Sequence, residues 1–245
     1  MPKPKFTTVR GVHDSLPEPF YTWRYIENLA RNMFSLFNYQ EINIPIFEHT
    51  SLFQRGIGAE TDVVSKEMYT FDDKGGDSIT LRPEATASIC RAYVQHALYN
   101  KQKLNKLFFI GPMFRYERPQ SGRLRQFHQI DAEAIGSSDP AIDAEMITML
   151  VNFLKSAGLK DLQLQINNLG DLESRENYSK ELKEFLLDKG SSLDSETKDR
   201  INKNPFRFLD SKNPQHQELI ELAPTNEKFL GNDSLEHMES VKNYL

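Results

Sequence analysis

Two strand-like runs, the second of which alternates polar and apolar residues, constrain the fold of this chain more than any other feature. They span residues 107–116 and 125–135 and flank a Pro-Gln-Ser-Gly turn, the spacing of a long β-hairpin. Because successive side chains of a strand point to opposite faces, the second run has one polar face and one apolar face. The polar face carries Arg125, Phe127, Gln129, Asp131 and Glu133. The pattern predicts an antiparallel sheet with one polar face.

Helical patterns surround this hairpin. Apolar residues at three- and four-residue steps predict a helix that begins after Pro17 and Pro19 and runs to Phe37. A second helix is predicted over residues 84–99, and a third from Asp139-Pro140 to Gly158. The fold class is therefore α/β in the α+β sense, a mainly antiparallel sheet flanked by helices.

Further strands are expected in three places. Alternating isoleucines predict a strand over residues 41–47, in which Pro45 marks an unpaired edge. Residues 79–81 form a strand after a hairpin turn at residues 72–76, and residues 162–166 return a strand to the sheet. Beyond Gly170 the sequence is acidic with helical patterns. We predict two domains, residues 1–170 and a mostly helical unit at residues 171–245.

Composition excludes several classes of protein. The 245 residues contain no apolar run long enough to span a bilayer, and the basic N-terminus is not followed by an apolar segment. Together these features predict a cytoplasmic protein without membrane contact. One cysteine and six scattered histidines lack zinc-ligand spacing, so no metal site built from side chains is expected. The loop at residues 55–61 lacks the third glycine of a dinucleotide fingerprint, and the chain has no P-loop motif.

Charge is distributed unevenly. The net formal charge is −5, yet Glu117 is the single acid among the basic residues between Lys101 and Gln129. A local basic stretch in an acidic protein favours a pocket for a phosphorylated small molecule over a broad nucleic-acid surface. Arginines suit phosphate oxygens, Phe127 offers a stacking plane, and carboxylates suit ammonium or imidazole nitrogens. The alternative is a solvated sheet face with weak surface ion pairs.

Residues 114–129, Phe-Arg-Tyr-Glu-Arg-Pro-Gln-Ser-Gly-Arg-Leu-Arg-Gln-Phe-His-Gln, resemble motif 2 of class II aminoacyl-tRNA synthetases in its histidyl-tRNA synthetase form. Three further segments are similar to that family, at residues 10–14 (Arg-Gly-Val-His-Asp), 62–69 (Asp-Val-Val-Ser-Lys-Glu-Met-Tyr) and 81–87 (Leu-Arg-Pro-Glu-Ala-Thr-Ala). The resemblance implies a class II synthetase catalytic core at residues 1–170, followed by the helical insertion of the family.

The resemblance also implies a role for individual residues. Arg115 would be the catalytic residue and would hold the α-phosphate of ATP. Glu117 would bind the adenine amino group, and Phe127 would stack on the base. Arg123 would bind the distal phosphates. Glu84, Thr86 and Gln129 would surround the α-ammonium of histidine, with Glu133 toward the imidazole. From the residues alone, a first-turn helix acid after Pro83 is the preferred explanation of Glu84, and the resemblance reverses that preference. Arg118 and Arg125 stay open between site and surface, whereas His128 is expected in the core and Cys90 is not expected to be a catalytic thiol.

The activity implied is ligation of histidine to tRNA-His through a histidyl-adenylate, with Mg²⁺ accompanying ATP. A homodimer is expected through the first helix, with Trp23, Met33 and Phe37, and the isoleucine strand. In this family the chain continues with an Arg-Gly-Leu-Asp-Tyr-Tyr segment, a motif 3 and an anticodon-binding domain, none of which occurs before Leu245. We therefore expect a truncated chain that does not form adenylate by itself. Two alternatives are the histidine-binding regulatory subunit of ATP phosphoribosyltransferase, a non-enzymatic paralogue, and a structural dimerisation fragment.

Overall fold

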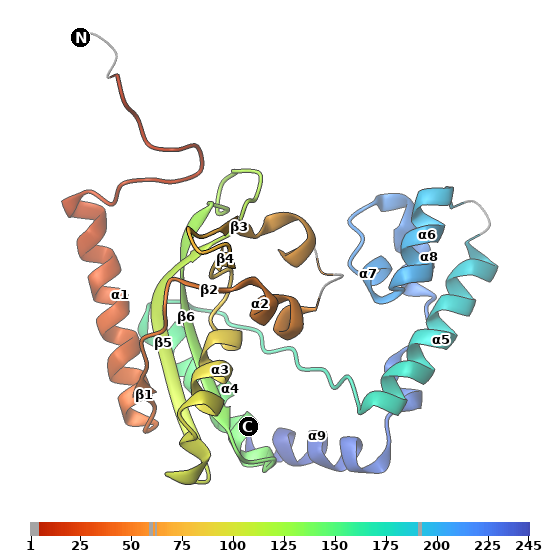
Figure 1. The fold of residues 1–245 in the computed structure, drawn as a ribbon. Coiled ribbons are helices and arrows are strands. Elements are labelled where there is room, and N and C mark those ends of the chain that lie inside the picture. Colours follow the sequence, from red (N-terminus) through yellow and green to blue (C-terminus); the bar gives the residue numbers. More distant parts are fainter. Residues whose placement is uncertain (1–4, 59–60, 62, 191–192) are drawn as a thin grey trace. The chain divides into compact units, whose positions relative to one another are not determined.

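The computed structural model describes residues 5–58, 61, 63–190 and 193–245. The chain forms two compact units, Met1–Leu162 and Gln163–Leu245, shown in Figure 1. The predicted domain boundary at residue 170 lies eight residues after the boundary between these two units at residue 162. Residues 1–4 at the N-terminus, residues 59–60 of the glycine-containing loop, and Asp62 of the family segment at residues 62–69 lie outside the described residues.

Two small sheets form the centre of the first unit. β5 (Asn105–Phe114) pairs antiparallel with β6 (Gln126–Ile135) along its whole length, and β1 (Gln40–Glu41) runs parallel to β5 on its other side. In the second sheet β4 (Ser78–Leu81) lies between β2 (Phe47–His49) and β3 (Tyr69–Asp72), antiparallel to both. Both predicted hairpins and the mainly antiparallel sheet are confirmed.

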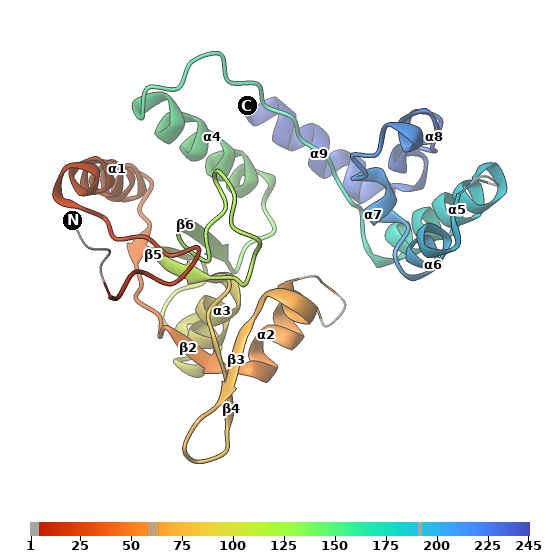
Figure 2. The same ribbon diagram turned by 90° about the horizontal axis from the view of Figure 1, so that it is seen from above.

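Helices cover both faces of the β5–β6 hairpin (Figure 2). α1 (Pro17–Leu36) and α4 (Pro140–Ser156) pack on the apolar face, where Phe34 stacks on Phe108 at a centroid distance of 4.4 Å. Asp139 caps α4 by accepting a hydrogen bond from the Ala141 amide. Two shorter helices, α2 (Thr50–Ile57) and α3 (Thr86–Gln95), lie on the opposite side.

The second face of β5 is also apolar. Leu107, Phe109 and Met113 of this strand form one buried cluster with Ile44 and, from the start of α3, Ala85 and Ile89. A short π-helix (Val63–Glu67) precedes β3, and a 3-10 turn (Leu98–Asn100) follows α3. The predicted helix over residues 84–99 is thus shorter than expected, because the chain turns at Ala97, which has a positive φ of 47°.

The prediction of one strand over residues 41–47 is wrong, because residues 42–46 belong to no strand. The two ends of this segment belong to different sheets, since β1 pairs with β5 and β2 pairs with β4. The buried Arg82 guanidinium lies between them and donates to the carbonyl oxygens of Ile44 (2.6 Å), Pro45 (3.2 Å) and Pro112 (2.9 Å). Carbonyls that bind a side chain are not available for a strand ladder, so this segment crosses from one sheet to the other.

One other expectation requires correction. Residues 162–166 form no strand in the described structure, and Leu162 and Leu164 are exposed. The three residues expected at a dimer interface, Trp23, Met33 and Phe37, are half-buried in this unit. Trp23 lies against His128, with ring centroids 4.9 Å apart, and Met33 and Phe37 pack against the buried cluster under α4.

The described elements of the second unit are all helical. They are α5 (Leu172–Lys189), α6 (Ser195–Lys203), α7 (Phe206–Leu209), α8 (Gln217–Glu221) and α9 (Asn232–Tyr244), with 3-10 turns at Pro214–His216 and Asn226–Phe229. Their own core contains Tyr178, Leu182, Leu186, Ile201 and Phe208.

Candidate active site

The turn end of the β5–β6 hairpin joins all four segments that the sequence singles out. The Phe114 amide donates to the carbonyl of Arg82 at 3.0 Å, and the Tyr116 amide to that of Glu67 at 2.6 Å. The Arg125 amide donates to the carbonyl of Gly11 at 2.8 Å. Segments far apart in sequence are thus fixed by main-chain bonds around one set of polar side chains.

Gly11 is required where it is. Its φ is +85°, and a Cβ atom there would lie 2.9 Å from side-chain carbons of Arg125 and Pro119. The Arg125 guanidinium lies 3.9 Å from the centre of the Tyr116 ring, and its Nε donates to the Glu117 carbonyl. These contacts give Arg125 a role in holding the hairpin end, whereas Arg118 is exposed.

Arg115 directly follows β5 and is held from two sides. Its Nε donates to the carbonyl of Pro83 at 2.8 Å, and its guanidinium carbon lies 5.1 Å from the centre of the Phe127 ring. The hydrogen bond occupies Nε, and together with the Phe127 ring it fixes the plane of the Arg115 guanidinium. Among the described residues, none engages the terminal guanidinium nitrogens, so these can donate to an anionic ligand.

Glu117 and Arg123 form an ion pair across the turn, with Oε2 and Nη1 3.4 Å apart. The Arg123 side chain is 61% exposed, and that of Glu117 only 16%. A partly exposed ion pair of this kind contributes at most about 1 kcal/mol to stability. A ligand can therefore take the place of Arg123 beside Glu117 at a small cost in free energy. The structure therefore brings together all four residues that the sequence predicts for ATP.

The four residues predicted for histidine lie on two neighbouring elements. Thr86 begins α3 and donates to Oε1 of Glu133 on β6 at 2.6 Å. Glu84 lies just before α3, and not in its first turn as its alternative explanation expects, and its Oε1 accepts a hydrogen bond from the Ala87 amide at 3.0 Å. Burial raises the pKa of Glu133, which the Thr86 bond opposes and the charge of Glu84 reinforces.

Asp131 lies beside the predicted site residues, although the predicted set lacks it. It lies on β6 between Gln129 and Glu133, on the face that the alternation predicts. Burial, followed by the charges of Glu133 and Glu84, raises its pKa to about 6, against the opposing effect of Arg115. The period-two pattern was the signal for this residue, although it could not show how far Asp131 is buried.

His128 and Cys90 lie near the site without taking part in it. His128 projects from the other face of β6 toward Trp23, and burial lowers its pKa. Partial burial, together with Glu133 and Glu84, raises the pKa of the Cys90 thiol, so the nucleophilic thiolate is disfavoured.

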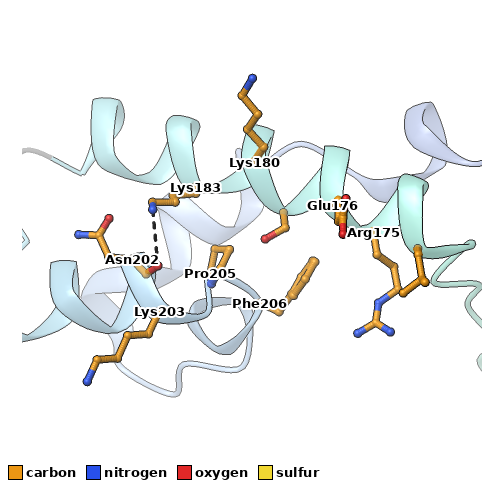
Figure 3. Close-up of a pocket in the computed structure, with 10 residues that line it drawn as sticks. Arg175, Glu176, Lys180, Lys183, Asn202, Lys203, Pro205 and Phe206 are labelled. Atoms are coloured by element: carbon orange, nitrogen blue, oxygen red, sulfur yellow. Dashed lines mark hydrogen bonds between the residues drawn. The ribbon is translucent and has the colours of Figure 1, made fainter. Parts of the chain in front are cut away.

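The second unit has a groove of about 550 Å³ that sequence reasoning missed. Arg175, Lys180 and Lys183 of α5 line it with Lys203 of α6, and Glu176 is the one acidic residue among the described residues of the lining. Figure 3 shows Lys183 reaching Asn202, whose carbonyl accepts its hydrogen bond at 3.5 Å. The basic residues of this groove come from both α5 and α6, so no single stretch of the sequence contains them all.

Within the described residues, no group of three or more His, Cys, Asp or Glu side chains could hold a metal ion. The same residues include no helix that is long and apolar enough to cross a membrane.

An antiparallel hairpin flanked by helices, with Arg115, Glu117 and Phe127 at its turn end, has the architecture of a class II aminoacyl-tRNA synthetase core. The histidyl-tRNA synthetase family profile matches residues 11–222. The chain belongs to the histidyl-tRNA synthetase family.

Individual relatives agree with this assignment. The histidine–tRNA ligase of Halothermothrix orenii is 52% identical over 96% of this chain, and that of Halalkalibacterium halodurans 49% over 96%. The apo structure of S. aureus histidyl-tRNA synthetase is 39% identical over 98% of the chain, with a TM-score of 0.74. A structure from Bacillus halodurans titled as an ATP phosphoribosyltransferase regulatory subunit/histidyl-tRNA synthetase shares the fold at 21% identity, with a TM-score of 0.66. The chain spans about half the length of the curated relatives it matches, 56% and 55% for the first two.

Proposed function

We propose that this chain carries the ATP and histidine subsites of a histidine–tRNA ligase, which joins histidine to tRNA-His through histidyl-adenylate in protein biosynthesis. The observation that carries the proposal is the fixed Arg115 guanidinium between Pro83 and Phe127, beside a buried row of histidine-compatible acceptors.

ATP is proposed to lie over the end of the hairpin. Phe127 stacks on the base, Glu117 accepts from the adenine amino group, and Arg123 leaves Glu117 to meet the distal phosphates. Arg115 then lies at the α-phosphate. In adenylate formation a histidine carboxylate oxygen bonds to the α-phosphorus while the bond to the pyrophosphate oxygen breaks. Charge builds on the α-phosphate oxygens, and a donor fixed beforehand stabilises them without reorganising.

Histidine is proposed to bind between α3 and β6. Glu84, Thr86 and Gln129 receive the α-ammonium, and Glu133 receives the imidazole N–H. Burial raises the pKa of Glu133 because the ionised carboxylate is poorly solvated there. A cation bound beside it would stabilise the ionised form.

Other partners follow from the family. Mg²⁺ is proposed to enter with ATP as part of the substrate, since the described residues provide no protein-built site for it. Phosphates of tRNA-His find cations in the groove of the second unit. The compartment proposed is the cytoplasm.

A homodimer is proposed, supported by exposed aromatic and aliphatic side chains on α1 and near β2. These are Tyr21, Tyr25, Leu36, Ile46 and Phe47. Sedimentation at micromolar concentration tests the dimer, and a monomer contradicts it.

Isothermal titration of this chain with L-histidine and, separately, with ATP tests the two subsites. Binding of both ligands is expected. Binding of histidine alone would favour the regulatory-subunit alternative, and binding of neither would leave a structural fragment.

A further inference from the structure

Two buried acceptors on β6 have no hydrogen-bond donor among the described residues. They are Oε1 of Gln129 and Oδ2 of Asp131, neighbours on the same face of the strand. An unsatisfied buried acceptor costs roughly the desolvation of that group, and native proteins contain few. Two adjacent ones point to a donor that the chain itself does not supply.

The surrounding elements explain why the chain cannot supply it. Across the hairpin, Gln129 faces Gly111, and Asp131 faces Phe109, so β5 offers no polar side chain at either position. At the start of α3, the Thr86 hydroxyl is committed to Glu133.

The remaining charged groups do not satisfy Asp131 either. Glu133 and Glu84 carry the same charge as Asp131, and the cation that acts on it is Arg115. Arg115 acts on Asp131 through its charge, and no hydrogen bond joins its guanidinium to Oδ2 of Asp131. Oδ2 of Asp131 is thus a buried carboxylate oxygen without a donor, in a half-buried side chain that feels the charges of two other carboxylates.

We propose that Asp131 is a substrate-binding residue, whose Oδ2 accepts a hydrogen bond from a nitrogen of bound histidine next to Gln129. This inference rests on the proposed function and adds a residue to its amino-acid subsite. The ligand chemistry follows from the surroundings, because an acceptor pair among three carboxylates favours a cationic N–H donor and repels an anion.

The pKa of Asp131 supplies an independent readout. In the free protein it is about 6, so near pH 6 the group is partly protonated. A cationic N–H donor stabilises the ionised form, so binding at this pH releases up to roughly half a proton from Asp131.

The experiment is calorimetric titration of L-histidine into this chain, the Asp131→Asn variant, and the matched control Asp77→Asn in the exposed β3–β4 turn. At pH 7.5 we expect at least fivefold weaker histidine binding for Asp131→Asn and unchanged binding for Asp77→Asn, with equal ATP affinity in all three. Repeating the titration at pH 6 in two buffers of different ionisation enthalpy measures proton release, which should be smaller in Asp131→Asn.

The outcomes separate this inference from the proposed function. Histidine affinity of Asp131→Asn within fivefold of the unchanged chain, or equal proton release, overturns the role of Asp131 and leaves the histidine subsite in place. If the unchanged chain binds neither histidine nor ATP, the proposed function itself fails. Circular dichroism of each variant shows whether it is folded before it is titrated.

Discussion

At the scale of single residues, the surroundings of Arg115 fit it to bind a phosphate group of ATP. Replacing it with alanine removes a fixed, charge-assisted donor worth about 1.5 to 3 kcal/mol, which corresponds to a loss of ATP affinity of roughly 10- to 150-fold. Calorimetry measures the loss, with Arg24→Ala on the exposed side of α1 as the control. An Arg115→Ala chain that binds ATP as tightly as the control would refute the assignment.

Asp131 also predicts a pH dependence of stability. Its folded pKa is raised from 3.8 to about 6, so the folded state holds a proton that the unfolded state has lost between these values. The free energy of unfolding therefore falls as pH rises from about 4 through 6. We expect Asp131→Asn to stabilise the free protein at pH 7 by roughly 1 to 2 kcal/mol, after allowance for solvent screening, and to have little effect at pH 4.

Urea unfolding at the two pH values checks this difference, with Asp77→Asn as the reference. A variant that is equally destabilised at both would show that Asp131 makes a favourable contact in the free protein. The expected combination, higher stability with weaker histidine binding, is typical of a residue kept for its ligand.

At the scale of elements, the buried Arg82 connects the two sheets. Its guanidinium binds the link between β1 and β2 and the end of β5, and lies 4.6 Å from the Phe109 ring. Arg82→Met preserves volume but leaves three carbonyls without their donor, so we expect a loss of about 2 to 4 kcal/mol in the free energy of unfolding. Chemical denaturation measures it, and a loss below about 1 kcal/mol, equal to that of Arg24→Ala, would contradict this role.

The sequence predicts elements well where local pattern and tertiary pairing agree. The β5–β6 hairpin and α4, with its Asp139 cap, follow from alternation and capping alone. Residues 41–47 do not, because the strand pattern is overridden by Arg82, a partner almost forty positions later in the chain. In the site, the alternation gives the face of Gln129, Asp131 and Glu133, but depth of burial depends on α3 and cannot be read from β6.

At the scale of the whole molecule, the chain has two units with separate cores. The segment between α4 and α5 has no regular secondary structure, and Leu159, Leu162, Leu164 and Leu169 are exposed within it. We expect limited proteolysis with chymotrypsin to cleave this segment early and to leave two resistant pieces. Mass spectrometry identifies the cut sites, and early cleavage within α5 or α4 instead would contradict the division into two units.

The packing of Trp23 on His128 has an optical consequence. Trp23 is the sole tryptophan in the chain, and its partner ring lies on β6 between Phe127 and Gln129, whose side chains face the site. Because burial lowers its pKa, His128 becomes an imidazolium, a quencher of indole fluorescence, at lower pH than an ordinary histidine. Emission from this one fluorophore therefore reports on the back of the strand that holds the proposed ligands, and movement of β6 on binding should change its intensity without any added label.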